Sequence, residues 1–513
     1  MSPKSPRFRR AESMALLLAG VLCAASCASP ARTSDGAAGT AGGGATGGSA
    51  TGGSTGAAGT GGSGTATGGT GGTSGGVGGT SAGTAGHAGS TGAGGTGTTG
   101  TGGSGGSGSG GVSSGGGASG GGAAGNAGGG GTGAGGSSAP VVIPGAGHCA
   151  APTGASATDA KAAYDKWKAD LVVSDGAGGF LRVRRPNSSG AEVNSTVSEG
   201  IGYGMLLSVY ANDQDTFDKL WQYEQQFPDN HGLMNWYINA AGTMALGTGA
   251  ATDGDEDMAF ALVMADKRWG GQGSLSKSYL DSAKTIIGLI WQYEVDQTRN
   301  FVLTSGDQSD GSVINISYFA PAFYRAFGRV TGKASDWDKV IATSYTVISA
   351  TLNAQNGNAQ NGLVPAWSTP AGVPMTPPNT SMPLYHQLDS CRTPFRLAED
   401  YCWNATPQAL TYLQKITGFY SGVGVANMVD GYDLNGTPHP QFVTTGGPRA
   451  ASFVGPAGVG AMATGTTYVK LRDDAYASVA TLTQLAGSTY YQESWTALSL
   501  QMMTGLLQDL GAP

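Results

Sequence analysis

The sequence predicts an all-α domain over residues 141–513, built from six helical hairpins. Apolar residues recur there at spacings of three and four, which is the period of a helix with one buried face. Twelve such runs, the number that six nested hairpins need, are joined by loops of mixed length. The runs lie near residues 159–172, 199–211, 214–227, 255–268, 276–294, 319–330, 336–352, 393–404, 406–420, 451–463, 468–486 and 492–508.

Four loops between these runs are long enough to build the walls of a binding site, with room for short strands. Trp236, Trp367 and several tyrosines lie in or beside them. The loops span residues 228–250, 297–317, 354–391 and 421–450.

Residues 1–29 have the pattern of an export signal. A basic start is followed by the apolar run Met14–Ala25, which is too short to span a bilayer, and then by small residues that suit cleavage near Ala28. Cys27 leaves lipid attachment as an alternative, although Ala24 stands where such lipoprotein motifs usually carry Leu. We therefore expect an exported protein, either secreted or held at the cell surface by a lipid on Cys27.

Residues 30–140 consist of Gly, Ser, Thr and Ala with almost nothing else. More than half of the 92 glycines lie there, and no Asp, Glu, Lys or Arg occurs between Asp35 and Asp159. Such a segment cannot bury enough apolar surface to offset its ordering entropy, so we expect a disordered linker. Its random-coil end-to-end distance is about 50 to 60 Å. That length suits a domain tethered to a surface, and equally a plain spacer.

Residues 141–513 hold all nine tryptophans and form the one expected folded domain. From Asp159 onward, 22 basic residues stand against 32 acidic ones, a net charge of −10. This balance argues against nucleic acid or an anionic membrane as a partner. No transmembrane run occurs in the domain, and we expect a monomer.

Three cysteines, Cys149, Cys391 and Cys402, belong to this domain. Cys391 and Cys402 lie eleven residues apart in a largely helical stretch, roughly 16 Å on helix geometry, which is too far for a disulfide. Cys149 could pair with either of them and so fix the start of the domain. The sequence leaves both pairings open.

Four acids crowd the first turn of the helix predicted within Ala251–Trp269: Asp253, Asp255, Glu256 and Asp257. Thr252 or Asp253 suits the N-cap, and acids suit the positive end of the helix dipole. Capping explains one or two of these residues but not four in five positions, so the stretch indicates a functional site. A calcium loop is rejected, because Gly254 is misplaced for an EF-hand and Met264 stands where the bidentate Glu belongs.

Two further segments have unusual local sequences. Ser198–Met205 carries three glycines in five positions, which costs a helix about 1 kcal/mol each, so a packed helix or a bound ligand must require close approach of the backbone there. In Leu388–Arg396, Thr393 followed by proline predicts a helix start, which leaves Asp389 and Arg392 on the loop just upstream.

These segments together resemble glycoside hydrolase family 8. Ala251–Trp269 meets every position of the family signature A-[ST]-D-[AG]-D, two residues, Met or Ile, Ala, an apolar run and Trp. Leu388–Arg396 resembles the D-x-x-R-x-P-[WFY]-R motif of the larger subgroup, and Asn315–Phe319 resembles an N-P-S-Y-F segment with Ile316 in place of Pro. The resemblance implies an (α/α)6 barrel with its active site in a long cleft at one end.

The resemblance also implies the catalytic residues. Glu199 would be the general acid, and Asp389 the base that activates water. Asp253 would hold and distort the sugar at the cleavage point. Asp255 would support it through hydrogen bonds and contact substrate, whereas Asp257 is expected to face solvent or cap the helix.

Four more residues are implied as substrate contacts. Trp236 would stack on a sugar ring, because aromatic faces pack well on the apolar faces of β-linked sugars. Tyr318 would help to hold the attacking water. Arg392 and Tyr203 would contact the substrate, Arg392 either directly or through another residue. No cofactor or metal is implied.

The resulting expectation is an exported, tethered endo-glycosidase that cuts β-1,4-linked polysaccharide with inversion. A β-1,4-glucan is the first choice of substrate, with mixed-linkage glucan as a secondary one, and xylan and chitosan as alternatives. The rival class is a polysaccharide-binding surface protein whose catalytic apparatus has decayed. Retention of Glu199, Asp253 and Asp389 together argues against that rival.

Overall fold

The computed structural model describes residues 147–186, 192–378, 380–442, 451–482 and 490–512. The expected signal of residues 1–29 and the expected linker of residues 30–140 lie outside the described residues. In the described part of the chain, no helix combines the length and apolar character that crossing a membrane requires.

Each of the twelve predicted helical runs is a helix, and each helix begins within three residues of its predicted start. The helices are α1 (Ala157–Leu171), α2 (Ser198–Tyr210), α3 (Gln214–Glu224), α4 (Thr252–Arg268), α5 (Tyr279–Tyr293), α6 (Pro321–Thr331), α7 (Ala334–Thr351), α8 (Arg392–Asn404), α9 (Pro407–Val423), α10 (Ala451–Met462), α11 (Val469–Leu482) and α12 (Tyr490–Met503).

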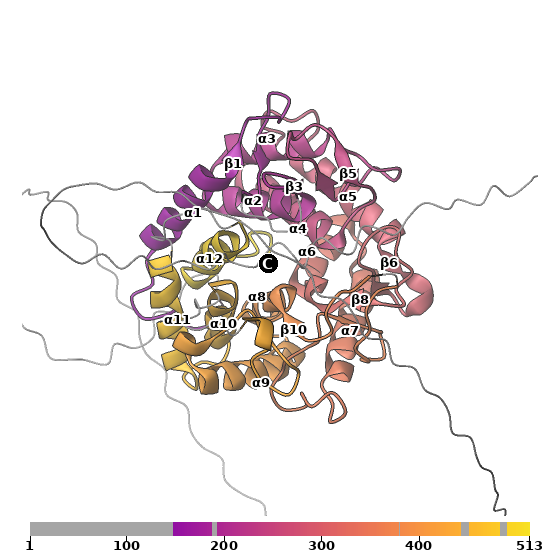
Figure 1. Ribbon diagram of the computed structural model, residues 1–513. Helices are drawn as coiled ribbons and strands as arrows, with labels where there is room; N and C mark the ends of the chain where they lie inside the picture. Colours follow the sequence, from indigo (N-terminus) through magenta and orange to yellow (C-terminus); the bar gives the residue numbers. More distant parts are fainter. Residues whose placement is uncertain (1–146, 187–191, 379, 443–450, 483–489, 513) are drawn as a thin grey trace, which may run out of the picture. The chain divides into compact units, whose positions relative to one another are not determined.

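Alternate helices form a closed inner ring. Helices α2, α4, α6, α8, α10 and α12 each contact the next, and α12 returns to α2, while the odd-numbered helices lie outside them (Figure 1). Burial follows this division. Helix α4 is buried on all sides from Thr252 to Ala265, whereas the outer helix α5 buries one face. Six helical hairpins thus close into the (α/α)6 barrel that was expected.

Short antiparallel strands line the segments that lead into the inner helices. They are β1 (Val172–Val173) with β2 (Arg182–Val183); β3 (Thr196–Val197), β4 (Tyr237–Ile238) and β5 (Ala245–Gly247) in one sheet; β6 (Val295–Asp296) with β7 (Val302–Leu303); β8 (Ile314–Asn315) with β9 (Trp367–Ser368); and β10 (His386–Gln387) with β11 (Gly431–Tyr432). The expected strands in the four long loops are confirmed. The sequence did not predict β1, β2, β3 or β6.

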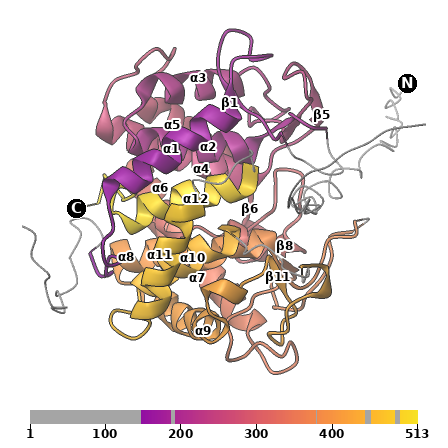
Figure 2. The ribbon, with the colours of Figure 1, turned by 60° about the vertical axis from the view of Figure 1, so that its left-hand side comes forward.

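The inner helices all run in the same direction, because an outer helix returns the chain between each pair of them. Their N-termini therefore lie at one end of the barrel. Strand β3 leads directly into α2, β5 precedes α4, β8 precedes α6 and β10 precedes α8, so the strands mark this end. Several of them, including β5, β8 and β11, lie together on the right of Figure 2.

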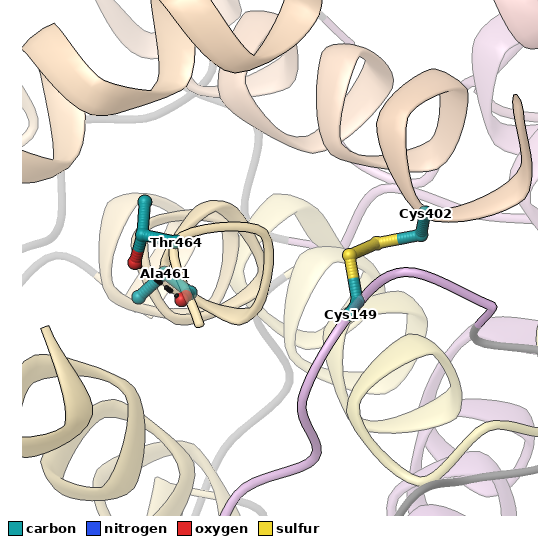
Figure 3. Close-up of a disulfide and its surroundings, with 4 residues drawn as sticks. All are labelled: Cys149, Cys402, Ala461 and Thr464. Atoms are coloured by element: carbon teal, nitrogen blue, oxygen red, sulfur yellow. Dashed lines mark hydrogen bonds between the residues drawn. A yellow bond between two sulfur atoms is a disulfide. The ribbon is translucent and has the colours of Figure 1, made fainter. Parts of the chain in front are cut away.

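A disulfide joins the start of the domain to the opposite end of α8. Cys149 pairs with Cys402, near the last residue of the helix, with the two Cα atoms 5.1 Å apart (Figure 3). Backbone contacts accompany it, since His148 N donates to Cys402 O at 3.2 Å and Ala150 N donates to Met462 O at 3.0 Å. Cys391 is a buried free thiol. The structure thus selects one of the two open pairings.

Two predicted helix starts are wrong in detail. Neither Thr252 nor Asp253 caps α4, because the helix begins at Thr252, Ala251 takes the N-cap position and no side chain bonds there. Asp389 is not on a loop but in a 3-10 turn, η3 (Leu388–Cys391), which continues into α8 at Arg392. A proline in the first turn of α8 is tolerated there, since the first N–H groups of a helix have no partner within the helix.

Candidate active site

Glycines bring the N-terminal turns of α2 and α4 into contact. A Cβ on Gly254 would lie 2.8 Å from the backbone carbon of Ser198 and 2.9 Å from the nitrogen of Glu199, and a Cβ on Gly202 would lie 2.8 Å from Asp257 Cβ. The glycine-rich sequence of α2 is therefore explained by a packed helix. As a result, Glu199 and Asp253 stand side by side at the end of the barrel that carries the strands.

A short sheet fixes the start of α2. Val197 of β3 pairs with Tyr237 of β4, and Ser198 N donates to Trp236 O at 3.0 Å. The indole of Trp236 is pressed against Gly247, where a Cβ would lie 2.3 Å from the ring nitrogen. The predicted sugar-stacking Trp236 is thus held beside the predicted acid, although little of its surface is exposed.

Arg392, the first residue of α8, joins the three predicted catalytic acids. Its Nη1 donates to Glu199 Oε2 at 2.9 Å and to Asp253 Oδ2 at 2.5 Å. Its Nη2 lies 3.6 Å from Asp389 Oδ1. One guanidinium, itself buried, therefore holds carboxylates from α2, α4 and η3 around a single positive charge.

Asp389 is also held from the side of β8 and η2 (Ile316–Tyr318). Asn315 Nδ2 donates to Asp389 Oδ2 at 3.2 Å, and Asn315 Oδ1 accepts from the hydroxyl of Ser317 at 2.7 Å. Ser317 Oγ in turn accepts from Arg392 Nε at 3.1 Å. This closed circuit fixes the orientation of the predicted base relative to the guanidinium.

The bridge through Arg392 limits the separation of Glu199 and Asp389. Their contacts to the two terminal nitrogens keep the nearest carboxyl oxygens within about 9 Å of each other, a ceiling that accommodates the roughly 6.5–9.5 Å spacing of an inverting pair. The side chains of Glu199 and Asp389 each remain 13% exposed. Both carboxyls can therefore be reached from the end of the barrel.

Burial raises the pKa of Asp253 and Asp389, and the charge of the Arg392 guanidinium lowers it. Burial raises the pKa of Asp253 to about 7, against the lowering effect of Arg392 and with a further rise from the charge of Glu199. Burial also raises the pKa of Asp389, and Arg392 again opposes it. Asp253 thus carries a proton part of the time near neutral pH, which lets it donate a hydrogen bond as well as accept one.

Three of the predicted substrate contacts are buried. Tyr203 and Asp255 have 1% and 0% of their surface exposed, and Arg392 has 2%. Arg392 contacts the predicted acids, which is one of the two arrangements expected of it, and the Tyr203 hydroxyl lies 3.4 Å from Arg392 Nη1. The substrate contacts of Tyr203, Arg392 and Asp255 stay predictions, made for side chains that are buried in this structure.

Tyr318 lies on the other side of the same guanidinium. The centre of the Arg392 guanidinium stands 4.9 Å from the Tyr318 ring centroid, and the ring meets Trp367 of β9 edge to face at 6.4 Å. Tyr318 is thus beside Arg392 and near Asp389. Its role in holding the attacking water stays a prediction.

Asp257 was expected to face solvent or cap the helix, but the structure does not place it at the surface. It is buried and pairs with Arg396 of α8, which also contacts Glu399 at 3.4 Å. Burial raises the pKa of Asp257 to about 6, opposed by the charges of Arg396 and Arg392. The prediction was wrong because α4 is an inner helix enclosed by its neighbours, a position that the local sequence does not reveal.

Asp255 lies against a second buried acid. Neither Asp255 nor Glu294 has any exposed surface, and none of their four carboxyl oxygens has a hydrogen-bond donor among the described residues. Burial raises the pKa of both groups, that of Glu294 to about 8, and the charge of Glu294 raises the pKa of Asp255 further. Two adjacent carboxylates cannot both ionise in such a site, so the pair retains a proton at neutral pH.

Because the buried Asp255–Glu294 pair retains a proton, we expect Asp255→Asn to change the pH dependence of stability. Carboxyls of the unfolded protein lose their protons above pH ~4, whereas the folded wild-type pair keeps one proton. The free energy of unfolding of the wild type therefore falls as the pH rises from about 4 toward about 8, the pKa of Glu294 in the folded protein. The asparagine amide can donate to Glu294 and lets it ionise. The free energy of unfolding of the variant should then fall less steeply with rising pH than that of the wild type. The two slopes should differ by up to about 1.4 kcal/mol per pH unit.

Denaturant unfolding at several pH values between 5 and 8 measures this slope. The Asp336→Asn substitution, at a partly exposed position near the start of α7, is the matched control and should leave the slope unchanged. Equal slopes for wild type and Asp255→Asn would show that the buried pair does not hold a proton.

Sequence reasoning missed Tyr490, the first residue of α12. Its hydroxyl donates to Glu199 Oε1 at 2.7 Å, so both oxygens of the predicted acid are held, one by a phenol and one by Arg392. Asn315 and Ser317 were recognised only as parts of a segment. No local pattern distinguishes Tyr490, because its role depends on α12 closing the inner ring against α2.

One group of described residues has the geometry to hold a cation. The candidate ligand atoms of Asp229, His231 and Asp307 lie within 4.8 Å of one another. Contacts within the protein account for this grouping: His231 Nδ1 pairs with Asp307 Oδ2 at 2.6 Å, and Asp307 Oδ1 accepts from Ala250 N at 2.8 Å. These bonds connect the loop after β7 to the residues that precede α4.

The fold and this arrangement define a class of protein. Two partly exposed carboxyls, Glu199 and Asp389, share one guanidinium with a third carboxyl, Asp253, and the ring of Tyr318 lies alongside. Paired carboxyls of this kind are what glycoside hydrolysis requires. Residues 148–505 match the model of the glycosyl hydrolases family 8. The chain belongs to glycoside hydrolase family 8.

Relatives and solved structures agree with this assignment. The chain is 35% identical to Endoglucanase A of Acetivibrio thermocellus over 350 residues, covering 67% of this chain and 69% of the relative. It is 37% identical to Endoglucanase C of Ruminiclostridium cellulolyticum over 352 residues, covering 68% and 71%. A β-1,3-1,4-glucanase structure from Paenibacillus sp. X4 superimposes with a TM-score of 0.60 at 29% identity, covering 70% of this chain and 95% of that one.

Proposed function

We propose that this protein is an endo-acting glycosidase that hydrolyses β-1,4-linked glucan with inversion at the anomeric carbon. Glu199 protonates the oxygen of the bond that breaks. Asp389 takes a proton from the attacking water on the opposite face of the sugar. Asp253 holds the sugar ring at the cleavage point through hydrogen bonds.

The shared guanidinium of Arg392 is the observation that carries this proposal. It holds Glu199 and Asp253 on one nitrogen and faces Asp389 with the other. The positive charge favours the ionised form of Asp389, which a base requires, against the burial that raises its pKa. A protein that only bound polysaccharide would gain nothing from burying three acids around one cation.

The names of the relatives support a glucan substrate. Two relatives of 35% and 37% identity are called endoglucanases, and the structural relative of 29% identity is a β-1,3-1,4-glucanase. A cold-adapted family 8 xylanase shares the fold with a TM-score of 0.58 at 20% identity, which bears on the fold alone. Mixed-linkage glucan stays the secondary substrate, and xylan and chitosan stay the alternatives.

Release of reducing ends from four polysaccharides tests the substrate. We expect the fastest release from carboxymethylcellulose, slower release from barley mixed-linkage glucan, and little from xylan or chitosan. Faster release from xylan or chitosan than from either glucan would replace the proposed substrate. No release from any of them, by protein that is folded and binds sugar, would favour the decayed binding protein.

We further propose that the protein is exported and that residues 30–140 tether the catalytic domain of residues 141–513. The basic and apolar pattern of residues 1–29 supports export, and the composition of residues 30–140 supports a flexible tether. Cys27 as a lipid attachment point is the finer form of this proposal. Labelling of the Cys27→Ala variant with a radioactive fatty acid, compared with wild type in cells, tests it.

Deleting residues 1–140 should leave a folded domain whose activity on short oligosaccharides is unchanged, because residues 30–140 have almost no apolar surface to pack on a core and the apolar run before them belongs to an export signal that is expected to be cleaved. Thermal unfolding should stay cooperative, with a midpoint within a few degrees of that of the longer protein. Loss of the cooperative transition would show that residues before 141 belong to the folded domain.

A further inference from the structure

Two of the four long loops meet at a group of possible metal ligands. Asp229 and His231 belong to the loop of residues 228–250, and Asp307 belongs to the loop of residues 297–317. Their candidate ligand atoms lie within 4.8 Å of one another. Ligand atoms around a tetrahedral Zn²⁺ ion stand about 3.3 Å apart, so small movements of these side chains are enough to bring them onto one ion.

Contacts within the protein account for His231 and Asp307 but leave one oxygen of Asp229 without a partner. Asp229 Oδ1 accepts from the backbone nitrogens of His231 and Gly232, both at 2.8 Å, and of Leu233 at 3.0 Å. Asp229 Oδ2 is buried and has no hydrogen-bond donor among the described residues. Burial of a carboxylate oxygen without a donor or a cation is costly, so this oxygen requires a ligand.

The two carboxyls of the group lie close together without a basic side chain to neutralise both. Asp307, whose side chain is 2% exposed, pairs with His231, but neither Asp229 nor Asp307 forms an ion pair with a lysine or arginine in the part of the chain that the structure describes. Burial raises the pKa of Asp307, and the neighbouring carboxyl of Asp229 raises it further. A divalent cation bound between the two carboxyls would remove this repulsion.

Surrounding contacts already hold the ligands in place. Asp307 Oδ1 accepts from Ala250 N at 2.8 Å, and the His231 ring stacks on that of Tyr293, the last residue of α5, with 3.9 Å between the ring centroids. Ligands that are fixed before binding lose little conformational freedom when the ion arrives. The side chain of His231 is 34% exposed, which gives an ion access from solvent.

The types of donor atom select the class of ion. Calcium takes six to eight oxygen ligands, whereas an imidazole together with carboxylates suits a transition metal such as Zn²⁺. Three protein ligands and one water complete a tetrahedral zinc site.

We propose that Asp229, His231 and Asp307 bind one Zn²⁺ ion, which joins the loop of residues 228–250 to the loop of residues 297–317. The ion has a structural role, and the inference does not depend on the proposed function.

The site is connected to the catalytic acids through the backbone. Asp307 holds Ala250, which lies two residues before the start of α4 and three before Asp253. None of the three ligands forms a hydrogen bond with Glu199, Asp253 or Asp389 among the described residues. A bound ion would therefore fix the segment that leads into α4 without taking part in the reaction.

Titration calorimetry with zinc chloride tests the site on the full-length protein, made without a histidine tag and treated with EDTA. We expect one zinc ion to bind per chain. The midpoint of thermal unfolding should rise by a few degrees at about a hundredfold excess of zinc over its dissociation constant. Calcium chloride should bind at least about tenfold more weakly than zinc chloride.

Two variants remove one ligand each and keep the local structure. In Asp229→Asn the amide oxygen can still accept from the three backbone nitrogens, but the negative charge is lost. In His231→Phe the ring can still stack on Tyr293 but has no nitrogen. Each variant should weaken zinc binding by about tenfold or more. Cooperative thermal unfolding confirms that each is folded, and either one alone is sufficient for the test.

The matched control is Asp433→Asn. Asp433 Oδ1 pairs with His439 Nδ1 at 2.7 Å, which is the same kind of contact as that between Asp307 and His231. Among the described residues, this pair has no third ligand close enough to share an ion. The control should bind zinc as the wild type does.

Three results would overturn the proposal. Absence of zinc binding by the wild type up to about 1 mM shows that the group is held together by protein contacts alone. Wild-type affinity in Asp229→Asn or in His231→Phe places the ion at other residues. Calcium binding as tight as zinc binding shows that the class of ion is wrong.

Discussion

Replacing Glu199 by glutamine should reduce hydrolysis of polysaccharide by roughly 10²–10⁴-fold. The amide cannot deliver a proton to the leaving oxygen, yet it can still accept from Tyr490 and is close in shape to the original side chain. Substrates whose leaving groups need little protonation, such as aryl glycosides with acidic phenols, should keep a much larger share of their turnover. Initial rates on both kinds of substrate give the two ratios.

The matched control is Glu192→Gln, which makes the same chemical change at an exposed position four residues before the start of β3. Glu192 Oε2 accepts from the backbone nitrogen of Ala240, and a glutamine oxygen can keep that bond. This variant should retain wild-type rates. A Glu199→Gln protein with near wild-type activity on polysaccharide would remove Glu199 from the mechanism.

Replacing Asp389 by asparagine should lower turnover by a comparable factor on every substrate, including those with good leaving groups, because the water loses its proton acceptor whatever group departs. Glu199→Gln, in contrast, should spare substrates with good leaving groups. The amide keeps the contact with Asn315 available and is matched in size, so the protein should still bind oligosaccharides. Turnover and titration calorimetry on the same preparation separate the two effects.

A smaller side chain offers a second arm of this experiment. In Asp389→Ala, azide can enter the space left by the carboxyl, attack in place of water and restore turnover of activated substrates. Asp336→Asn, on the outer helix α7, is the matched control and should behave as wild type. Undiminished activity of Asp389→Asn would require another residue to be the base.

The sequence was sufficient to predict the twelve helices because the helical period is a local property, and the family resemblance implied their closure into a barrel. All twelve runs are helices, and the alternation of outer and inner helices explains why α4 is buried on all sides from Thr252 to Ala265 while α5 buries one face. The helix starts were less accurate where tertiary contacts decide them. At Thr252, close packing of Gly254 against α2 replaced the expected side-chain cap.

The fold brings the predicted acids Glu199, Asp253 and Asp389 together around Arg392. Arg392 was expected to contact the substrate directly or through another residue, and its burial among three carboxylates could not be predicted from a motif that fixes only residue types. Tyr490 was missed for a related reason. Its contact with Glu199 crosses 291 residues of sequence and exists only because α12 closes the ring.

The buried acids near the site are a second case in which the sequence did not reveal the partners of a residue. Asp255 and Asp257 belong to the most recognisable stretch of the chain, but their side chains are buried against residues of other segments. Glu294 follows α5 and Arg396 lies in α8. The sequence pattern of one segment indicates that these acids have a function. It does not reveal their partners, because those depend on how the inner helices pack.

The anomeric configuration of the first product is the most direct test of the central claim, that Glu199 and Asp389 act as an inverting pair. Proton NMR, followed from the first minutes of hydrolysis of a β-1,4-linked oligosaccharide, distinguishes the two anomers before they equilibrate. An inverting pair, with a water between the base and the sugar, must release the α-anomer first. Initial accumulation of the β-anomer would contradict the account, since it requires a covalent intermediate and a nucleophile in place of the base.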